Sequence, residues 1–133
     1  MTITISLTTI PTPSHFREIP MEYVQLLFLL FIGHAFCDYA FQNDFVAQAK
    51  NHTTALGKLY WKHVLPAHGL MHSLPVFIIT QSFVLTLFEF FAHCVIDYLK
   101  CDNKLTFSQD QFLHLGCKVL YVVLLAVGLP YLI

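Results

Sequence analysis

Three apolar stretches of this chain each carry polar side chains at a spacing of four residues. The three ladders are His34, Asp38 and Gln42; Glu89, His93 and Asp97; and Asp110, His114 and Lys118, and a fourth stretch adds His68 and His72. Residues four apart lie on one face of an α-helix, so each ladder predicts a polar stripe along an otherwise apolar helix. The chain must fold so that these four stripes do not face an apolar environment.

The composition indicates what that environment is. The 133 residues are 56% hydrophobic and 11% charged, whereas soluble domains are usually about 25% charged. Thirteen Phe and six Tyr add further apolar surface. A small soluble domain has a high ratio of surface to volume and could not bury so many apolar side chains. The composition therefore predicts an integral membrane protein.

Apolar runs of about 20 residues are long enough to cross a bilayer as helices. They predict an all-α, four-helix transmembrane bundle with helices at residues 23–42, 60–79, 82–99 and 111–132. These helices form one domain over residues 21–133. The Ser-, Thr- and Pro-rich residues 1–20 are expected to be a disordered N-terminal arm. The second helix is the least regular of the four, because it contains two prolines.

The distribution of lysines predicts the orientation of the bundle. The two loops on one side carry, or directly adjoin, Lys50, Lys58, Lys62, Lys100 and Lys104. The opposite side has only Arg17 and the uncharged turn at residues 80–81. By the positive-inside rule, the lysine loops are expected in the cytoplasm and both termini outside.

This topology places all four polar stripes in the same half of the bilayer. At about 1.5 Å per residue, His34, His72, Glu89 and Lys118 lie about 12 to 16 Å below the cytoplasmic surface. A charged side chain within lipid costs about 2.5 to 3.5 kcal/mol on insertion scales, so the stripes are expected to face one another or a water-filled cavity. Glu89 and Lys118, at similar depth, are expected to form a buried pair.

The side chains of this polar layer predict a metal site. The expected ligands are His34, Asp38, His68, His72, His93, Asp97 and His114. Imidazole and carboxylate suit divalent zinc, manganese or iron, and helix bundles often build metal sites from inward-facing side chains one turn apart. The set is large enough for two ions, an arrangement suited to phosphoester hydrolysis. Two points stay open: a hydrogen-bond network between helices is the competing interpretation, and either His68 or His72 can be the one that faces the site.

Four motifs in a fixed order carry a resemblance to a known family. They are HAFCDYAFQND at 34–44, AHGLMH at 67–72, HCVIDYLK at 93–100 and DQFLH at 110–114. With them, the chain from Met21 onward resembles domain of unknown function 3307, small multi-span membrane proteins of bacteria and their phages. The resemblance implies a fold and a location in a bacterial inner membrane, without an activity. By position, it points to His34, Asp38, Gln42, His68 or His72, His93, Asp97, Asp110, Gln111 and His114.

The leading functional hypothesis is a hydrolase acting on a membrane lipid or a lipid-linked phosphoester. Asp110 would serve as general base for a water activated by the metal, and Lys118 would stabilise negative charge on the substrate. The alternative is a non-catalytic phage or bacterial membrane module that binds metal or a membrane partner. Under either hypothesis, the protein can be a homo-oligomer.

Two other classes of function are disfavoured. The net charge of −1, without a basic stripe, gives no electrostatic basis for binding nucleic acid. Ion or proton transport ranks last, because residues 23–33 and 119–133 offer almost no ionisable groups on the outer side of the layer.

Overall fold

The computed structural model describes residues 20–128, and its regular structure in this range is entirely helical. Five α-helices and one short π-helix follow one another as α1 Met21–Ala35, η1 Phe36–Ala40, α2 Asp44–Ala49, α3 Ala55–Thr80, α4 Phe83–Cys101 and α5 Phe107–Ala126. The prediction of an all-α fold is confirmed. The proposed disordered arm falls almost wholly on residues 1–19, which lie outside the described range, as do residues 129–133.

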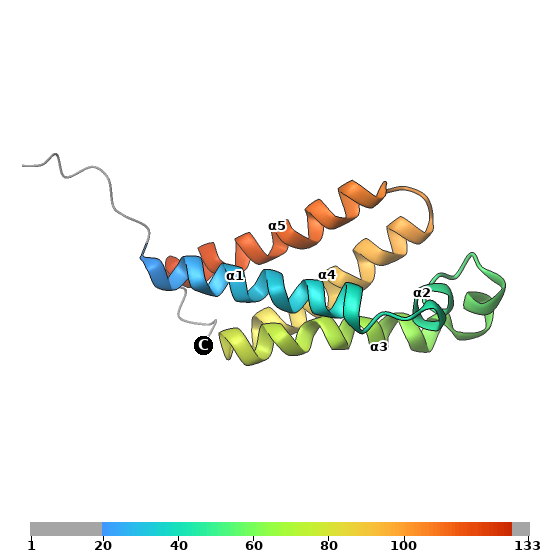
Figure 1. Ribbon diagram of the computed structural model, residues 1–133, viewed down its shortest axis with the longest axis horizontal. Helices are drawn as coiled ribbons and strands as arrows, with labels where there is room; N and C mark the ends of the chain where they lie inside the picture. Colours follow the sequence, from blue (N-terminus) through green and yellow to red (C-terminus); the bar gives the residue numbers. More distant parts are fainter. Residues whose placement is uncertain (1–19, 129–133) are drawn as a thin grey trace, which may run out of the picture.

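Four long helices form a bundle, and the short α2 covers one of its ends (Figure 1). Helix α1 packs against α3 and α5, and α4 packs against the same two helices. Helix α2 packs on α3. Figure 1 shows α2 and the α4–α5 loop at one end, with the α3–α4 turn and the start of α1 at the other. The two lysine loops therefore lie at the same end of the bundle, which we call the lysine end.

Side-chain caps determine where the helices begin. Thr54, Ser82 and Thr106 each accept a hydrogen bond from a backbone N–H in the first turn of α3, α4 and α5, respectively. Thr106 forms a reciprocal capping box with Gln109. These caps explain why α3 and α5 begin five and four residues before the apolar runs that predicted them, so those predicted boundaries were wrong. Helix α3 continues through Pro66 and Pro75.

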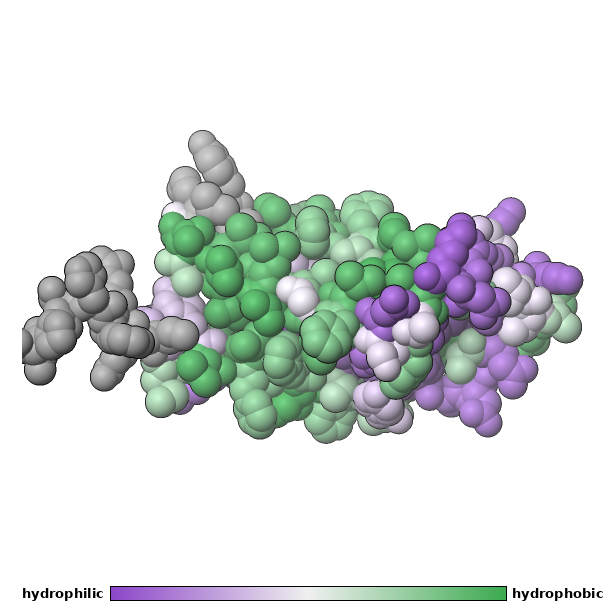
Figure 2. Space-filling model, turned by 90° about the horizontal axis from the view of Figure 1, so that it is seen from above, coloured by the Kyte–Doolittle hydropathy of each residue, from purple (hydrophilic) through white to green (hydrophobic). Residues whose placement is uncertain are grey.

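The distribution of polar side chains in this bundle is inverted relative to a soluble protein. Among the described residues, twelve polar or charged side chains and only ten hydrophobic ones are buried, while 29 large hydrophobic side chains are exposed. On the face that Figure 2 shows, hydrophobic residues cover most of the bundle and hydrophilic residues gather toward the lysine end. Soluble domains bury their apolar residues and almost never fully bury so many charged ones.

One helical stretch in the described range, Met21–Ala40, is long and apolar enough to cross a membrane, with a mean hydropathy of 1.4. The prediction of four such spans is therefore not confirmed. The physical reason is that the ladders place polar side chains within the helices. Helix α4, for example, contains Glu89, Asp97 and Lys100. Polar and charged side chains of this kind lower the mean hydropathy of α3, α4 and α5 below that of α1.

Close contact between α1 and α3 depends on Gly33. A Cβ atom at this position would lie 2.7 Å from Cβ of Pro75, whereas a Cβ at Gly116 on α5 would meet no atom within 4 Å. We expect Gly33→Ala to lower the free energy of unfolding by about 1 to 3 kcal/mol, the usual cost of overpacking. Gly116→Ala, the matched control, should be neutral or stabilising by up to about 1 kcal/mol.

Unfolding of the two variants in detergent micelles, followed by circular dichroism, measures both effects. Equal stability of Gly33→Ala and Gly116→Ala would show that α1 and α3 do not need this close approach.

Candidate metal centre

The structure brings all four polar stripes into one cluster inside the bundle. His34 comes from α1, Asp38 from η1, His68 and His72 from α3, Glu89, His93 and Asp97 from α4, and Asp110, His114 and Lys118 from α5. All of these are buried except Asp38, whose side chain is 11% exposed. Both His68 and His72 face the interior, which answers the question that the sequence left open. The predicted convergence of the ladders is thus present in the fold.

The first carboxylate of the cluster, Asp38, is presented by a π-helical turn. The N–H of Phe41 donates to the carbonyl of Phe36, five residues back, at 3.0 Å. A π-turn widens the helix by one residue and often occurs at functional sites. Here it lies at the end of the α1 segment, where Asp38 enters the interior. The four-residue spacing of the ladder did not predict this π-helical turn.

Three imidazoles surround Asp38. The Nε2 atoms of His72, His34 and His68 lie 3.2, 3.3 and 3.6 Å, respectively, from its carboxylate oxygens. One of these histidines is the i−4 neighbour of Asp38, and the other two come from α3. Asp38 and its three imidazoles therefore form a compact set of nitrogen and oxygen donors, which we call the Asp38 set.

A second carboxylate, Asp97, is surrounded in the same way. The Nε2 atoms of His114, His93 and His68 lie 3.4, 3.6 and 3.7 Å, respectively, from its oxygens. His68 is shared with the Asp38 set. Asp110 extends this Asp97 set, because its Oδ1 lies 3.5 Å from Nε2 of His114. The imidazole rings lie close together, with centroids 3.7 Å apart for His72 and His93 and 4.3 Å apart for His93 and His114.

Most histidine nitrogens of this cluster make no hydrogen bond of good geometry with the described residues. Both ring nitrogens of His34, His68, His72 and His93, and Nε2 of His114, are buried and unpaired. Leaving a buried polar group unsatisfied costs about 1 to 3 kcal/mol, so nine such atoms in one place need an explanation. Nε2 atoms of these histidines lie 3.2 to 3.7 Å from carboxylate oxygens of Asp38 and Asp97. Coordination of a metal ion would satisfy the ring nitrogens, and a hydrogen-bond network between helices is the alternative.

The spacing of the donor atoms agrees with coordination of a common ion. Two ligands bound tetrahedrally at about 2.0 to 2.2 Å from one ion lie about 3.3 to 3.6 Å apart, close to the distances around Asp38 and Asp97. Three groups have ligand atoms within 4.8 Å of one another: His34, His72, Glu89 and His93; Asp38, His68, His72 and His93; and His93, Asp97 and His114. These residues can hold a metal ion.

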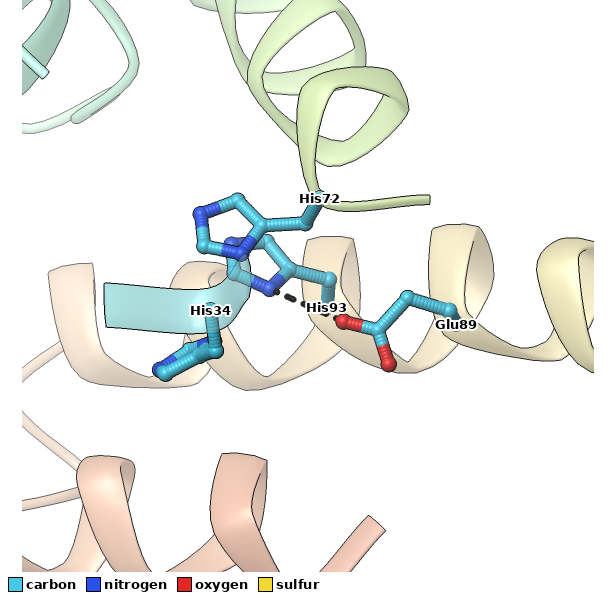
Figure 3. Close-up of side chains that lie close together, drawn as sticks. All are labelled: His34, His72, Glu89 and His93. Atoms are coloured by element: carbon cyan, nitrogen blue, oxygen red, sulfur yellow. Dashed lines mark ion pairs between the residues drawn. The ribbon is translucent and has the colours of Figure 1, made fainter. Parts of the chain in front are cut away.

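Glu89 closes the end of the cluster that lies away from the lysine end. Figure 3 shows it beside His93, with its Oε1 at 3.6 Å from Nδ1 of that ring. Lys118 donates to both carboxylate oxygens at 2.7 Å, and the hydroxyl of Tyr121 donates to Oε2 at 2.6 Å. The expected buried pair of Glu89 and Lys118 is therefore present. It holds the Lys118 ammonium away from the two Asp-centred sets.

Lysines also lie at the opposite end of the cluster, where it opens. Lys50 donates to Oδ2 of Asp97 at 2.5 Å and is only 7% exposed, and Lys100 lies 3.2 Å from Oδ2 of Asp110. Gln111 donates to Oδ2 of Asp38 at 3.0 Å. Sequence reasoning missed Lys50, which it placed in a solvated loop. No local pattern could have revealed it, because its partner is 47 residues away.

Two neighbouring spaces, which share lining residues, lie at this opening. An inner cavity of about 40 Å³ is bordered by Asp38, Asp97 and Asp110 together with the two lysines. An outer polar vestibule of about 480 Å³ lies between α2, α4 and the α4–α5 loop. Gln42, the last residue of the first ladder, lines both spaces. The cluster is thus reached from the lysine end.

A surface contact fixes the loop before α3 against the end of α4. His52 stacks on Tyr98 with ring centroids 4.2 Å apart, and its Nε2 lies 2.6 Å from Oδ1 of Asp102. Hydrogen bonds from Lys104 and His52 hold the pKa of the Asp102 carboxyl below its usual value. His52 is partly buried and helps to position the vestibule wall.

The fold and the cluster define a class: an all-helical protein with a buried His/Asp/Glu centre that can hold a metal ion. Comparison with known protein families identifies the family to which the chain belongs. The family described as protein of unknown function DUF3307 matches residues 26–130, and the chain belongs to this family. No curated protein and no solved structure matches it. The catalytic roles of Asp110 and Lys118 stay predictions.

The Glu89–Lys118 pair provides a test of the packing beneath the cluster. Lys118→Met should lower the free energy of unfolding by about 3 to 5 kcal/mol, because it leaves the Glu89 carboxylate buried and unpaired. Adding Glu89→Gln should restore most of the loss. Chemical denaturation in detergent measures both variants.

Lys104→Met serves as the control, since its ion pair with Asp102 is exposed and should contribute little. If Lys118→Met were as stable as Lys104→Met, the pair would not be a structural requirement of the interior.

Proposed function

We propose that this protein is a membrane-embedded metalloprotein that hydrolyses a phosphoester of a lipid or lipid-linked substrate. One observation carries the proposal: two carboxylates, Asp38 and Asp97, are each surrounded by three imidazole nitrogens inside a bundle whose outer surface is apolar. The buried imidazole and carboxylate donors support the metal site, and the apolar outer surface supports a location in the membrane.

The membrane location is supported by the inverted distribution of side chains. Exposed Phe28, Phe77, Phe91, Leu120 and Val123 come from all four long helices, so a hydrophobic belt surrounds the bundle. Lipid tails would cover this belt, while the charged groups stay inside, as expected of intramembrane ionisable residues. With the positive-inside rule, the lysine end faces the cytoplasm of a bacterial inner membrane and both termini lie outside.

The donor set suits two ions of a borderline divalent metal such as zinc, manganese or iron. Neutral imidazole and carboxylate are common ligands of these metals. The Asp38 set and the Asp97 set share only His68, so each has its own carboxylate and two imidazoles of its own. Paired ions in hydrolases clamp the attacking and leaving oxygens of a phosphoryl group.

The residues of the opening suit proton transfer. A divalent ion in the Asp97 set would polarise a phosphoryl oxygen and lower the pKa of a water. Asp110 borders the inner cavity, and its Oδ1 has no hydrogen-bond partner, so it can accept a proton there. The inner cavity of about 40 Å³ admits water, and the substrate would occupy the larger vestibule. Lys118 would stabilise charge on the substrate only if it left Glu89.

Metal content is the first test. Elemental analysis of detergent-purified protein should find zinc, manganese or iron in the wild type, and His93→Ala and Asp97→Ala should each lose about half of it or more, since both change the Asp97 set. His63→Ala is the control, because His63 is exposed on α3. Equal metal content in all four proteins, or none in any of them, would refute the metal centre.

Catalysis is tested separately, with protein that carries its metal. Thin-layer chromatography of phosphate-labelled bacterial lipids should show a product with the wild type. Asp110→Asn should retain the metal and lower the rate by about 10²- to 10⁴-fold, the usual contribution of a general base. The Lys118→Met/Glu89→Gln variant shows whether Lys118 takes part.

A protein that binds metal but releases no product would be the non-catalytic module that the sequence also allowed. Unchanged activity of Asp110→Asn would remove this residue from the mechanism.

A further inference from the structure

Two lysines converge on the opening of the metal centre from different elements. Lys50 follows α2 and Lys100 lies in the last turn of α4, yet both line the inner cavity and the vestibule. Each ammonium contacts a carboxylate of the Asp97 set: Lys50 contacts Asp97, and Lys100 contacts Asp110. Lysine stems are long and flexible, so small changes of side-chain conformation can move these charges toward the vestibule.

These contacts are unusual for a metal site, because each lysine competes with a metal ion for a carboxylate. A carboxylate that coordinates a cation has less negative charge to offer an ammonium group 2.5 or 3.2 Å away. Lys50 is almost completely buried and cannot simply turn to solvent. With metal bound, Lys50 needs another anionic partner close to its present position, and the partly exposed Lys100 lies beside it to contact the same anion.

The net charge of the cluster also indicates that the metal-loaded centre needs an anion. Four carboxylates, Asp38, Glu89, Asp97 and Asp110, face three ammonium groups, Lys50, Lys100 and Lys118, which leaves a net charge of −1 with neutral histidines. One divalent ion changes this to +1, and two change it to +3. A net charge in a low-dielectric interior is costly, so the loaded centre requires an anion.

From this geometry we infer that the vestibule is a phosphate-binding subsite in which Lys50 and Lys100 hold the phosphate group of the ligand beside the metal centre. The inference rests on the proposed metal centre and adds the recognition of the substrate. A phosphate monoester carries up to two negative charges, which offsets the +3 charge of the two-ion centre better than a single carboxylate does. Gln42 and Asn103 line the same space with amide donors.

The alternative is that the two lysines only neutralise Asp97 and Asp110 in the folded protein. In that case they would affect metal binding and stability, and phosphate would not bind. The two explanations differ in one measurable quantity, the affinity of metal-loaded protein for phosphate.

Isothermal titration of inorganic phosphate into metal-loaded protein, with excess metal removed by gel filtration, tests the inference. We expect saturable binding by the wild type and an affinity about tenfold or more weaker in Lys50→Gln and in Lys100→Gln, because each removes a charge-assisted hydrogen bond. Lys58→Gln removes an exposed lysine at the same end and should bind as the wild type does. Lys50→Arg should retain most of the affinity.

Metal analysis of the same samples separates the possible failures. If no sample holds metal, the metal centre and this inference both fail. If the wild type holds metal but does not bind phosphate, or if both glutamine variants bind it normally, only the phosphate subsite is refuted. Normal metal content with weakened phosphate binding supports the inference.

The source of the phosphate group is tested in bilayers. The titration is repeated in nanodiscs of phosphatidylcholine alone and of phosphatidylcholine with phosphatidic acid, whose headgroup is a phosphate monoester. Competition by phosphatidic acid supports a lipid headgroup as the occupant of the subsite. Equal phosphate affinity in both bilayers supports a soluble phosphate compound.

Discussion

The structure depends on mutual compensation among charged groups that the apolar surface of the bundle cannot accommodate. Four carboxylates, three lysines and five imidazoles are enclosed by four helices whose outer faces are rich in Phe, Leu and Val. Any one of these charges alone would be costly to bury, and together they nearly cancel. The orientation of each helix about its own axis follows from this constraint, since α1, α3, α4 and α5 must all turn their polar faces toward the interior of the bundle.

Close packing makes that compensation possible. Gly69 lies where a Cβ would come within 2.6 Å of Sγ of Cys94, so α3 and α4 can approach as closely as α1 and α3 do at Gly33. Small residues at such crossings let helix backbones come close together. The π-turn at Phe36–Ala40 has a related effect, because it changes the direction of the chain where Asp38 joins the cluster.

The sequence predicted the parts of this arrangement that are local and periodic. The spacing of four revealed the polar stripes, the short turn after Thr80 revealed the α3–α4 hairpin, and similar depth suggested the Glu89–Lys118 pair. It could not reveal the burial of Lys50, which depends on how α2 folds back over the end of α3. Neither could it reveal that Asp38 and Asp97 each collect three imidazoles, since that requires the crossing geometry of all four helices. The helix starts were missed because capping residues precede the apolar runs.

The two ends of the cluster differ in a way that bears on function. At the Glu89 end, Lys118 and Tyr121 saturate the carboxylate with three hydrogen bonds, and the apolar cluster of Leu30, Val76, Leu85, Tyr121 and Val122 packs at this end. At the lysine end, single contacts face a cavity and a vestibule. Within residues 20–128, an ion or water therefore has an open approach to the cluster from one end, where Lys50 and Lys100 lie. Such a dead-end site suits binding or hydrolysis, whereas transport needs access from both sides of the membrane.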